Sequence, residues 1–336
     1  MFGSLSTRNL EEARFMTERR VTLDSTRPFR ESLIFPAEKS LMTKLTRREW
    51  SKLALGSIAA ATVFPADSIG AQKSKRVDSR FNGVQIGAQS YSFRDRPLDE
   101  MLKAMVEVGV GSCELWAGHL EPKKLSREEL RRWRLDAPVG EIKAVREKFD
   151  RAGIDLYAFN YSMRDDFTDE ELERGFVMAR ALGAKVMTSS SNVSTAKRID
   201  TFARKHRMRV GMHNHSNLKN PNEFATPDSF MRAMEGTRNV VINLDIGHFT
   251  AANFDPVDFL RKHHDKIVTL HLKDRKRDQG DNMPFGEGDT PIKPVLALLR
   301  DNKWSIPANI EYEYKGADTI AEMKRCVEYC KQALTS

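Results

Sequence analysis

The segment VVINLDIGHFT, Val240–Thr250, shows what kind of strand this chain is built from. Its apolar run has the length and composition of a buried β-strand, and the run stops abruptly at Asp245. His248 follows three residues later. An Asp that forms a turn at a strand end is common, so a single D-x-x-H says little about function on its own. Its meaning depends on whether the other strands of the chain also end in polar residues.

Strand-like and helix-like segments alternate throughout residues 81–336. Several helix-like segments end in glycine, which is a common helix stop. The strand-like segments are residues 83–90, 111–116, 155–160, 184–190, 209–214, 240–245, 267–272 and 308–313. Eight strand–helix units predict a single (β/α)8 TIM barrel. A doubly wound open sheet is the alternative, but the first strand leads into GAQSYSF, which lacks the glycine spacing of a dinucleotide-binding loop.

Composition excludes several classes of protein. The 336 residues carry a formal charge of +8, and no long Lys/Arg run with interleaved aromatic residues occurs, so no nucleic-acid partner is expected. The three cysteines, Cys113, Cys326 and Cys330, give neither a disulfide framework nor the spacing of a zinc site.

The N-terminal part of the chain resembles a twin-arginine export signal. Residues 46–52 read TRREWSK, and an apolar run of 12 residues, Leu53–Phe64, follows before a stretch of small residues. A transmembrane helix needs roughly 20 apolar residues, so no stable membrane span is expected. The resemblance implies export of the folded protein by the twin-arginine (Tat) machinery to the periplasm or the medium.

These features divide the chain into three parts. Residues 1–71 are expected to be an N-terminal extension and signal peptide. Cleavage is expected between Ala66 and Gln72, and after Ala71 if the small residue before the cut decides the site. Met42 begins a signal of normal length, so we expect translation to start there. Residues 72–80 are a short basic linker, and residues 81–336 form the catalytic barrel.

Polar residues stand where the predicted strands end, and in a (β/α)8 barrel these ends meet at one mouth. They are Gln89 and Tyr91, Glu114, Trp116 and His119, Asn160, His213 and His215, Asp245 and His248, His271 and Lys273, and Glu311 and Glu313. A single buried His is more often a core residue than a ligand. However, Asp245, His271 and Glu311 end successive strands, and a divalent cation would relieve the repulsion between their two carboxylates. Mixed carboxylate and imidazole ligands suit Mn²⁺, Mg²⁺, Zn²⁺, Co²⁺ or Fe²⁺ alike.

From about Gly83 to the C-terminus, the chain resembles the xylose isomerase-like TIM barrels of the sugar phosphate isomerase/epimerase superfamily. The resemblance rests on LDIGH, on HLKD, on the loop PFGEGD at Pro284–Asp289 and on the Glu of the eighth strand. It implies that Asp245, His271 and Glu311 bind one divalent metal ion. It also implies that His248 holds a substrate oxygen.

One departure from that family's pattern concerns the fourth strand, where most of its members have a metal-binding Glu. Here the strand reads KVMTSSS, and no carboxylate occurs between Lys185 and Ile199. Its absence puts plain aldose–ketose isomerisation in doubt. The nearest replacements are His213, expected as the fourth metal ligand, and His215, expected as a base.

The predicted function is a metal-dependent sugar or keto-sugar isomerase or epimerase that moves a proton next to a carbonyl. The expected catalytic residues are His248, His215, Lys273 and Glu313. The expected substrate-binding residues are Gln89, Tyr91, His119, Asn160 and Glu287. The polar loop Arg275–Thr290 is expected to act as a lid.

Three alternatives remain. A keto-glycoside lyase or hydrolase would use the same metal and base, and the missing fourth-strand Glu favours it. A carbohydrate-binding barrel without catalysis is the second. The third is the DNA-repair endonuclease of this fold, which is disfavoured because no D-x-H follows His271.

Overall fold

A computed structural model describes residues 76–316 and 318–336 of the chain. The predicted extension, signal peptide and cleavage site lie outside these residues. Among the helices that are described, none combines the length and the hydropathy needed to cross a bilayer.

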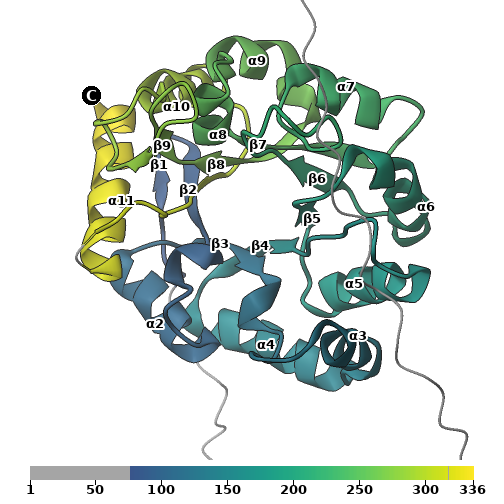
Figure 1. The fold of residues 1–336 in the computed structure, drawn as a ribbon. Coiled ribbons are helices and arrows are strands. Elements are labelled where there is room, and N and C mark those ends of the chain that lie inside the picture. Colours follow the sequence, from purple (N-terminus) through teal and green to yellow (C-terminus); the bar gives the residue numbers. More distant parts are fainter. Residues whose placement is uncertain (1–75, 317) are drawn as a thin grey trace, which may run out of the picture. The chain divides into compact units, whose positions relative to one another are not determined.

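Eight parallel strands close into a barrel, which Figure 1 shows along its axis with the helices outside. The strands are β2 (Val84–Gln89), β3 (Ser112–Trp116), β4 (Asp155–Asn160), β5 (Val186–Ser189), β6 (Val210–His213), β7 (Val240–Asp245), β8 (Ile267–Leu272) and β11 (Ala308–Ile310). Each strand pairs with the next, and β2 closes the ring by pairing with both β11 and β3. The predicted single (β/α)8 barrel is therefore confirmed.

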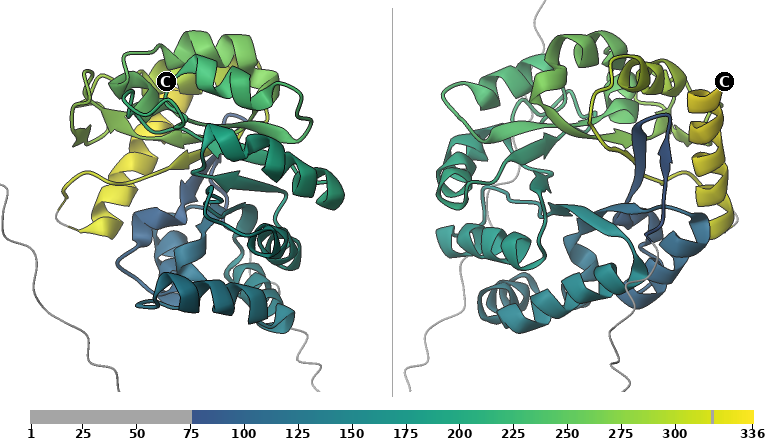
Figure 2. Two further views of the ribbon diagram at one scale, coloured as in Figure 1. Left: turned by 45° about the vertical axis from the view of Figure 1, so that its right-hand side comes forward. Right: turned by 180° about the vertical axis from the view of Figure 1, so that it is seen from behind.

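The helices form a ring around the strands, which is visible from three directions in Figures 1 and 2. They are α2 (Leu98–Val108), α3 (Arg127–Asp136), α4 (Val139–Ala152), α5 (Asp169–Ala181), α6 (Ala196–His206), α7 (Pro227–Met234), α8 (Ile246–Ala251), α9 (Pro256–His263), α10 (Ile292–Asp301) and α11 (Thr319–Thr335). Local sequence fixes many of their ends. Ser126 and Thr168 begin α3 and α5 with capping boxes, and Gly109 and Gly153 end α2 and α4 in the left-handed conformation.

Strand β7 shows how the core and the site arise from one segment. Val240, Ile242 and Leu244 belong to the large apolar core that includes residues of the surrounding helices. Val241 belongs instead to a small apolar cluster with residues of β4, β5 and β8. Because side chains alternate along a strand, Asp245 faces the barrel interior as Val241 does, at the carboxyl end of β7. All six residues of the strand are buried.

The eighth strand is shorter than predicted, since β11 ends at Ile310 rather than at residue 313. Glu311 nevertheless continues the pairing, because its amide donates to Leu272 O at 3.0 Å. At the N-terminal end of the barrel, the buried residues include Ser79, which directly precedes the short strand β1 (Arg80–Phe81).

The segment after β8 is folded rather than open. It contains the hairpin β9 (Asp274–Arg275) and β10 (Asn282–Met283). The buried carboxylate of Asp274 accepts hydrogen bonds from the amides of Gly286, Gly288 and Thr290 at 2.8–3.1 Å. A Cβ at Gly288 would lie only 2.0 Å from Asp274 Oδ1, so this close approach requires glycine.

Candidate metal centre and cavity

A cavity of about 340 Å³ opens at the carboxyl ends of the barrel strands. Its lining is polar and aromatic: Gln89, Tyr91, Trp116, Asn160, Ser162, Ser190, His213, His215, His248, His271, Lys273, Glu311 and Glu313. The barrel topology therefore brings together residues that are up to 224 positions apart in the sequence, from Gln89 to Glu313.

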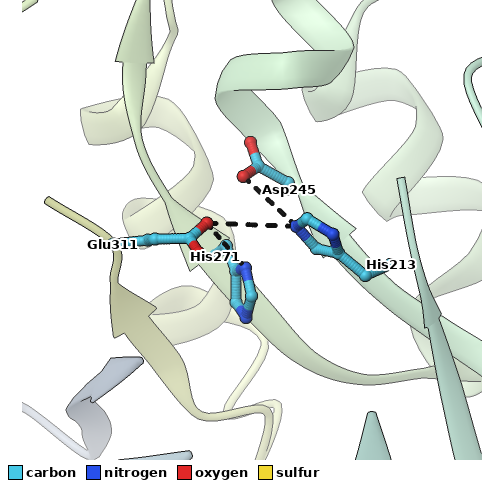
Figure 3. Close-up of side chains that lie close together, drawn as sticks. All are labelled: His213, Asp245, His271 and Glu311. Atoms are coloured by element: carbon cyan, nitrogen blue, oxygen red, sulfur yellow. Dashed lines mark hydrogen bonds and ion pairs between the residues drawn. The ribbon is translucent and has the colours of Figure 1, made fainter. Parts of the chain in front are cut away.

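Four buried side chains lie close together and point toward one another in Figure 3: His213, Asp245, His271 and Glu311. All of them except Asp245 line the cavity. One donor atom from each lies within 4.8 Å of the others. His213 Nε2 is 3.5 Å from Asp245 Oδ2 and 3.9 Å from Glu311 Oε2, too far for hydrogen bonds.

His213 Nε2 and Asp245 Oδ2 are buried and have no hydrogen-bond partner among the described residues. Asp245 Oδ2 is still contacted by the Lys273 ammonium at 3.2 Å, but the nearest carboxylate oxygen to His213 Nε2 is 3.5 Å away. Buried polar atoms are nearly always paired, so His213 Nε2 calls for a missing partner. Two imidazole nitrogens and two carboxylate oxygens are a donor set that divalent transition metals accept. These four residues fit a divalent metal ion.

His271 lies between two carboxylates. Its Nδ1 is 3.0 Å from Glu311 Oε2, and its Nε2 is 2.9 Å from Glu114 Oε2. Burial by itself lowers the pKa of His271, but Glu114 and Glu311 outweigh it and raise the pKa well above the ordinary value. We call His213, Asp245, His271 and Glu311 the ligand cluster. Because His271 donates its Nε2–H to Glu114, its Nδ1 is the nitrogen that faces the other three residues of this cluster.

Glu114 is the buried carboxylate that organises the interior below the four ligands. Besides His271, it accepts hydrogen bonds from the side chains of Gln89, Asn160, Thr188, Asn243 and Asn309. These five donors come from β2, β4, β5, β7 and β11, and His271 comes from β8. The Glu114 carboxylate on β3 therefore contacts side chains of six other strands. The sequence places Glu114 at a strand end but does not reveal this role. The only signal is a lone acidic residue in the otherwise apolar GSCELW.

Glu114→Gln should weaken metal binding by roughly tenfold to a hundredfold, because the charged acceptor that fixes the tautomer of His271 is replaced by a weaker, neutral amide. The new amide group would also face the amides that now donate to the carboxylate, so thermal stability should fall as well. Titration with Mn²⁺ and a thermal melt would measure both effects. Wild-type Mn²⁺ affinity in the variant would show that Glu114 does not position His271.

Ser190 holds His213 in place. It lies directly after β5, the fourth strand of the barrel, where the expected metal-binding Glu is missing. Ser190 Oγ lies 3.2 Å from His213 Nδ1, so the other ring nitrogen, Nε2, faces the ligand cluster. His215 turns away from that cluster. Its Nδ1 is 3.1 Å from Glu223 Oε1, and its ring lines the cavity.

Lys273 stands among the carboxylates at the floor of the cavity. Its Nζ lies 3.2 Å from Asp245 Oδ2, 3.0 Å from Glu311 Oε2 and 2.5 Å from Glu313 Oε2. Burial lowers the pKa of Lys273, but the three carboxylates outweigh burial and raise it above the ordinary value. Burial likewise opposes ionisation of Asp245 and Glu311, but Lys273 and the nearby imidazoles hold their pKa values below the usual range.

His248 lies between two cations. Arg275 Nη1 is 2.7 Å from its Nδ1, and Lys273 Nζ is 3.2 Å from its Nε2. Burial and the Lys273 charge hold the pKa of His248 well below its ordinary value, so the ring is neutral. Arginine and lysine can both only donate, and a neutral imidazole accepts at one nitrogen only. The shorter contact, to Arg275, makes Nδ1 the acceptor, so Nε2 carries the ring proton and forms no hydrogen bond with Lys273. Nε2–H and the Lys273 ammonium are thus two donors side by side, facing the cavity.

The remaining predicted residues divide into two groups. Gln89, Tyr91, Asn160 and Glu313 line the cavity, whereas His119 and Glu287 are not among its lining residues. Both ring nitrogens of His119 are engaged, with Ser90 Oγ at 2.9 Å and Phe93 O at 3.3 Å. Its ring packs edge-on against Trp116. Glu287 is exposed in the folded segment after β10.

The family follows from this fold and a sequence match. Residues 102–333 match the model of the family described as xylose isomerase-like TIM barrel, and the chain belongs to that family. An inosose dehydratase of Clostridium tetani (strain Massachusetts / E88) is 27% identical over 126 residues. That match covers 32% of this chain and 41% of the dehydratase, less than half of the relative's length.

Solved structures share the fold. An uncharacterised protein of Parabacteroides distasonis is 25% identical, with a TM-score of 0.55 over 74% of this chain and 99% of its own. The 3-keto-D-glucoside 4-epimerase of E. coli is 13% identical, with a TM-score of 0.56 over 74% of this chain and 99% of its own. At 13% identity, the likeness concerns the fold alone.

Proposed function

We propose that this protein is a metal-dependent enzyme that isomerises or epimerises a sugar or keto-sugar by proton transfer next to a carbonyl. One observation carries the proposal: a buried cluster of two imidazoles and two carboxylates, in which His213 Nε2 has no hydrogen-bond partner, borders a polar cavity at the barrel mouth. The match to the xylose isomerase-like family and the similarity to an inosose dehydratase agree with a sugar-like substrate.

The residues around the cluster have separable tasks in this proposal. His213, Asp245, His271 and Glu311 would hold the ion, which as a Lewis acid would polarise a substrate oxygen. The donors at His248 Nε2 and Lys273 Nζ lie 3.2 Å apart, so one negatively charged substrate oxygen could accept a hydrogen bond from both.

Two groups are placed to take a proton from carbon. Glu313 lies just past β11, and His215 lies just past β6 with its ring oriented by Glu223. The strands β7 and β8 separate these two positions in the sheet. A base on each side of the substrate is what epimerisation needs, because the proton leaves one face and returns to the other.

The deciding experiment measures deuterium uptake from D₂O into a panel of keto-sugars, followed by NMR in the presence of Mn²⁺. We expect deuterium at the carbon next to the carbonyl with the wild-type chain. Glu313→Gln should reduce the rate by about a hundredfold, in the range typical of general bases. The exposed Glu128, which is 83% accessible, gives the matched control Glu128→Gln with no expected effect. Metal-loaded protein that exchanges no proton in any sugar would refute the proposal.

Elimination of water is the second candidate reaction. It is favoured by the absence of a carboxylate at the end of β5, where Ser190 stands, and by the similarity to an inosose dehydratase. The same NMR experiment separates the two reactions. An enone or its tautomer, formed with loss of a hydroxyl, indicates a dehydratase, whereas exchange with all hydroxyls retained indicates an isomerase or epimerase.

We also propose that the protein works outside the cytoplasm, because TRREWSK and the apolar run after it resemble a twin-arginine signal. Changing Arg47 and Arg48 together to Lys should block export. Cell fractionation measures the effect, and mass spectrometry of the exported protein should find a new N-terminus near Ala71. Exported protein that keeps its intact N-terminal segment would contradict this.

A further inference from the structure

A second hollow lies beside the metal cavity and shares His215 and His248 with it. Its volume is about 560 Å³, and we call it the side groove. Its other lining residues are Ser216, Asn217, Leu218, Lys219 and Gln279. They come from the loop after β6 and from the turn between β9 and β10.

Hydrogen bonds fix both walls of the side groove. Arg275 Nη1 donates to Ser216 Oγ at 2.9 Å and so joins the hairpin to the loop after β6. The His215 amide donates to Phe224 O, and the Gln279 amide donates to Ala251 O, each at 2.8 Å. The groove is therefore formed before any ligand binds.

Most polar side chains of the side groove already have partners within the protein. Ser216 accepts from Arg275, and Gln279 Nε2 donates to Ala251 O at 3.3 Å. Asn217 donates to Glu223 and accepts from the amide of Lys219. These side chains offer few free hydrogen-bonding groups to a ligand.

Leu218 supplies the apolar surface. It is 50% exposed, the largest value among the large hydrophobic side chains of the described residues. An exposed leucine alone needs no explanation, but this one borders a hollow that shares two lining residues with the metal cavity.

We propose that the side groove binds the apolar aglycone of a glycoside whose sugar ring occupies the metal cavity. The assignment of the sugar ring rests on the proposed function. The shared residues His215 and His248 make the two spaces adjacent, so a group attached to the ring can enter the side groove. A second sugar fits less well, because few polar groups of the groove, chiefly the Lys219 ammonium, are left to pair with its hydroxyls.

The test compares three forms of the same sugars with the full chain in the presence of Mn²⁺. Glucose, galactose, mannose and xylose, each oxidised to a keto group at one ring carbon other than the anomeric carbon, are titrated as free sugars, as phenyl glycosides and as disaccharides, and calorimetry gives the dissociation constants. We expect the phenyl glycoside of the preferred sugar to bind about tenfold more tightly than the free sugar. Leu218→Asp should bring this ratio close to one. Leu125→Asp, at a leucine that is 38% exposed before α3, is the matched control and should keep the ratio.

The other outcomes overturn the inference in distinguishable ways. If sugars bind but the phenyl group adds no affinity, or if its gain survives Leu218→Asp, the side groove does not hold an aglycone and the proposed function stands. If disaccharides gain as much as phenyl glycosides, the groove recognises a second sugar. If no compound of the panel binds, the proposed function fails and this inference fails with it.

Discussion

Asp245→Asn and Glu311→Gln should each lose the bound metal ion and the activity together. Each change removes one of two negative charges that balance the cation, and it places an amide N–H where an oxygen would bind. Replacing a residue that only orients a metal ligand typically lowers metal affinity by about tenfold to a hundredfold. Replacing a ligand itself should lower the affinity more, on the order of a hundredfold or beyond. Elemental analysis after gel filtration measures the metal, and deuterium exchange measures the activity.

The design of these variants separates metal loss from misfolding. Asp245 Oδ1 accepts from the His248 amide at 2.7 Å and so caps α8. Asn is also a good cap, so Asp245→Asn can keep this bond through its carbonyl oxygen and retain the fold. The circular dichroism spectrum should therefore match the wild type, as should that of the exposed control Glu128→Gln. If both metal-site variants keep the wild-type metal content, the four-residue site is wrong.

The fold could be predicted closely from the sequence because each barrel strand is an apolar run that ends in polar residues. β7 and β8 have the predicted bounds, 240–245 and 267–272. The same logic brings Asp245, His271 and Glu311 together, because the carboxyl ends of adjacent parallel strands meet at one mouth. The eighth strand was predicted too long, because the alternation of IEYEY continues past Ile310, where the pairing stops after one more bond.

Contacts between non-adjacent strands could not be predicted. Glu114 receives hydrogen bonds from across the whole barrel, and no spacing in the sequence records them. Arg275 reaches His248 only because Asp274 folds the following segment back over the mouth. Period-two alternation put His213 and His215 on one face, but β6 ends at His213 and the chain then turns His215 toward Glu223. Because of that turn, His213 faces the ligand cluster and His215 does not.

Lys273→Met should leave metal affinity intact or raise it, in contrast to the carboxylate variants, although it too should abolish activity. In the metal-free protein, Lys273 is a cation within 3.2 Å of Asp245, Glu311 and Glu313. Removing one member of a buried charge cluster typically costs about 3 kcal/mol, because the others are left uncompensated. Because the pKa of Lys273 is raised above 10.5, its stabilisation is fully present at neutral pH and is lost only as the pH rises further.

Urea unfolding with a chelator should therefore show metal-free Lys273→Met to be less stable than the wild type by about that amount. Adding Mn²⁺ should remove most of the difference, because the ion supplies positive charge to the same carboxylates. Mn²⁺ affinity should equal or exceed that of the wild type, since a competing cation has been removed. Activity should still be lost, because the substrate oxygen loses one of its two donors.

Lys185→Met, at a side chain 59% exposed, is the matched control and should change neither stability nor metal binding measurably. Reduced Mn²⁺ affinity in Lys273→Met would show that this lysine supports the metal site rather than competing with it for the carboxylates.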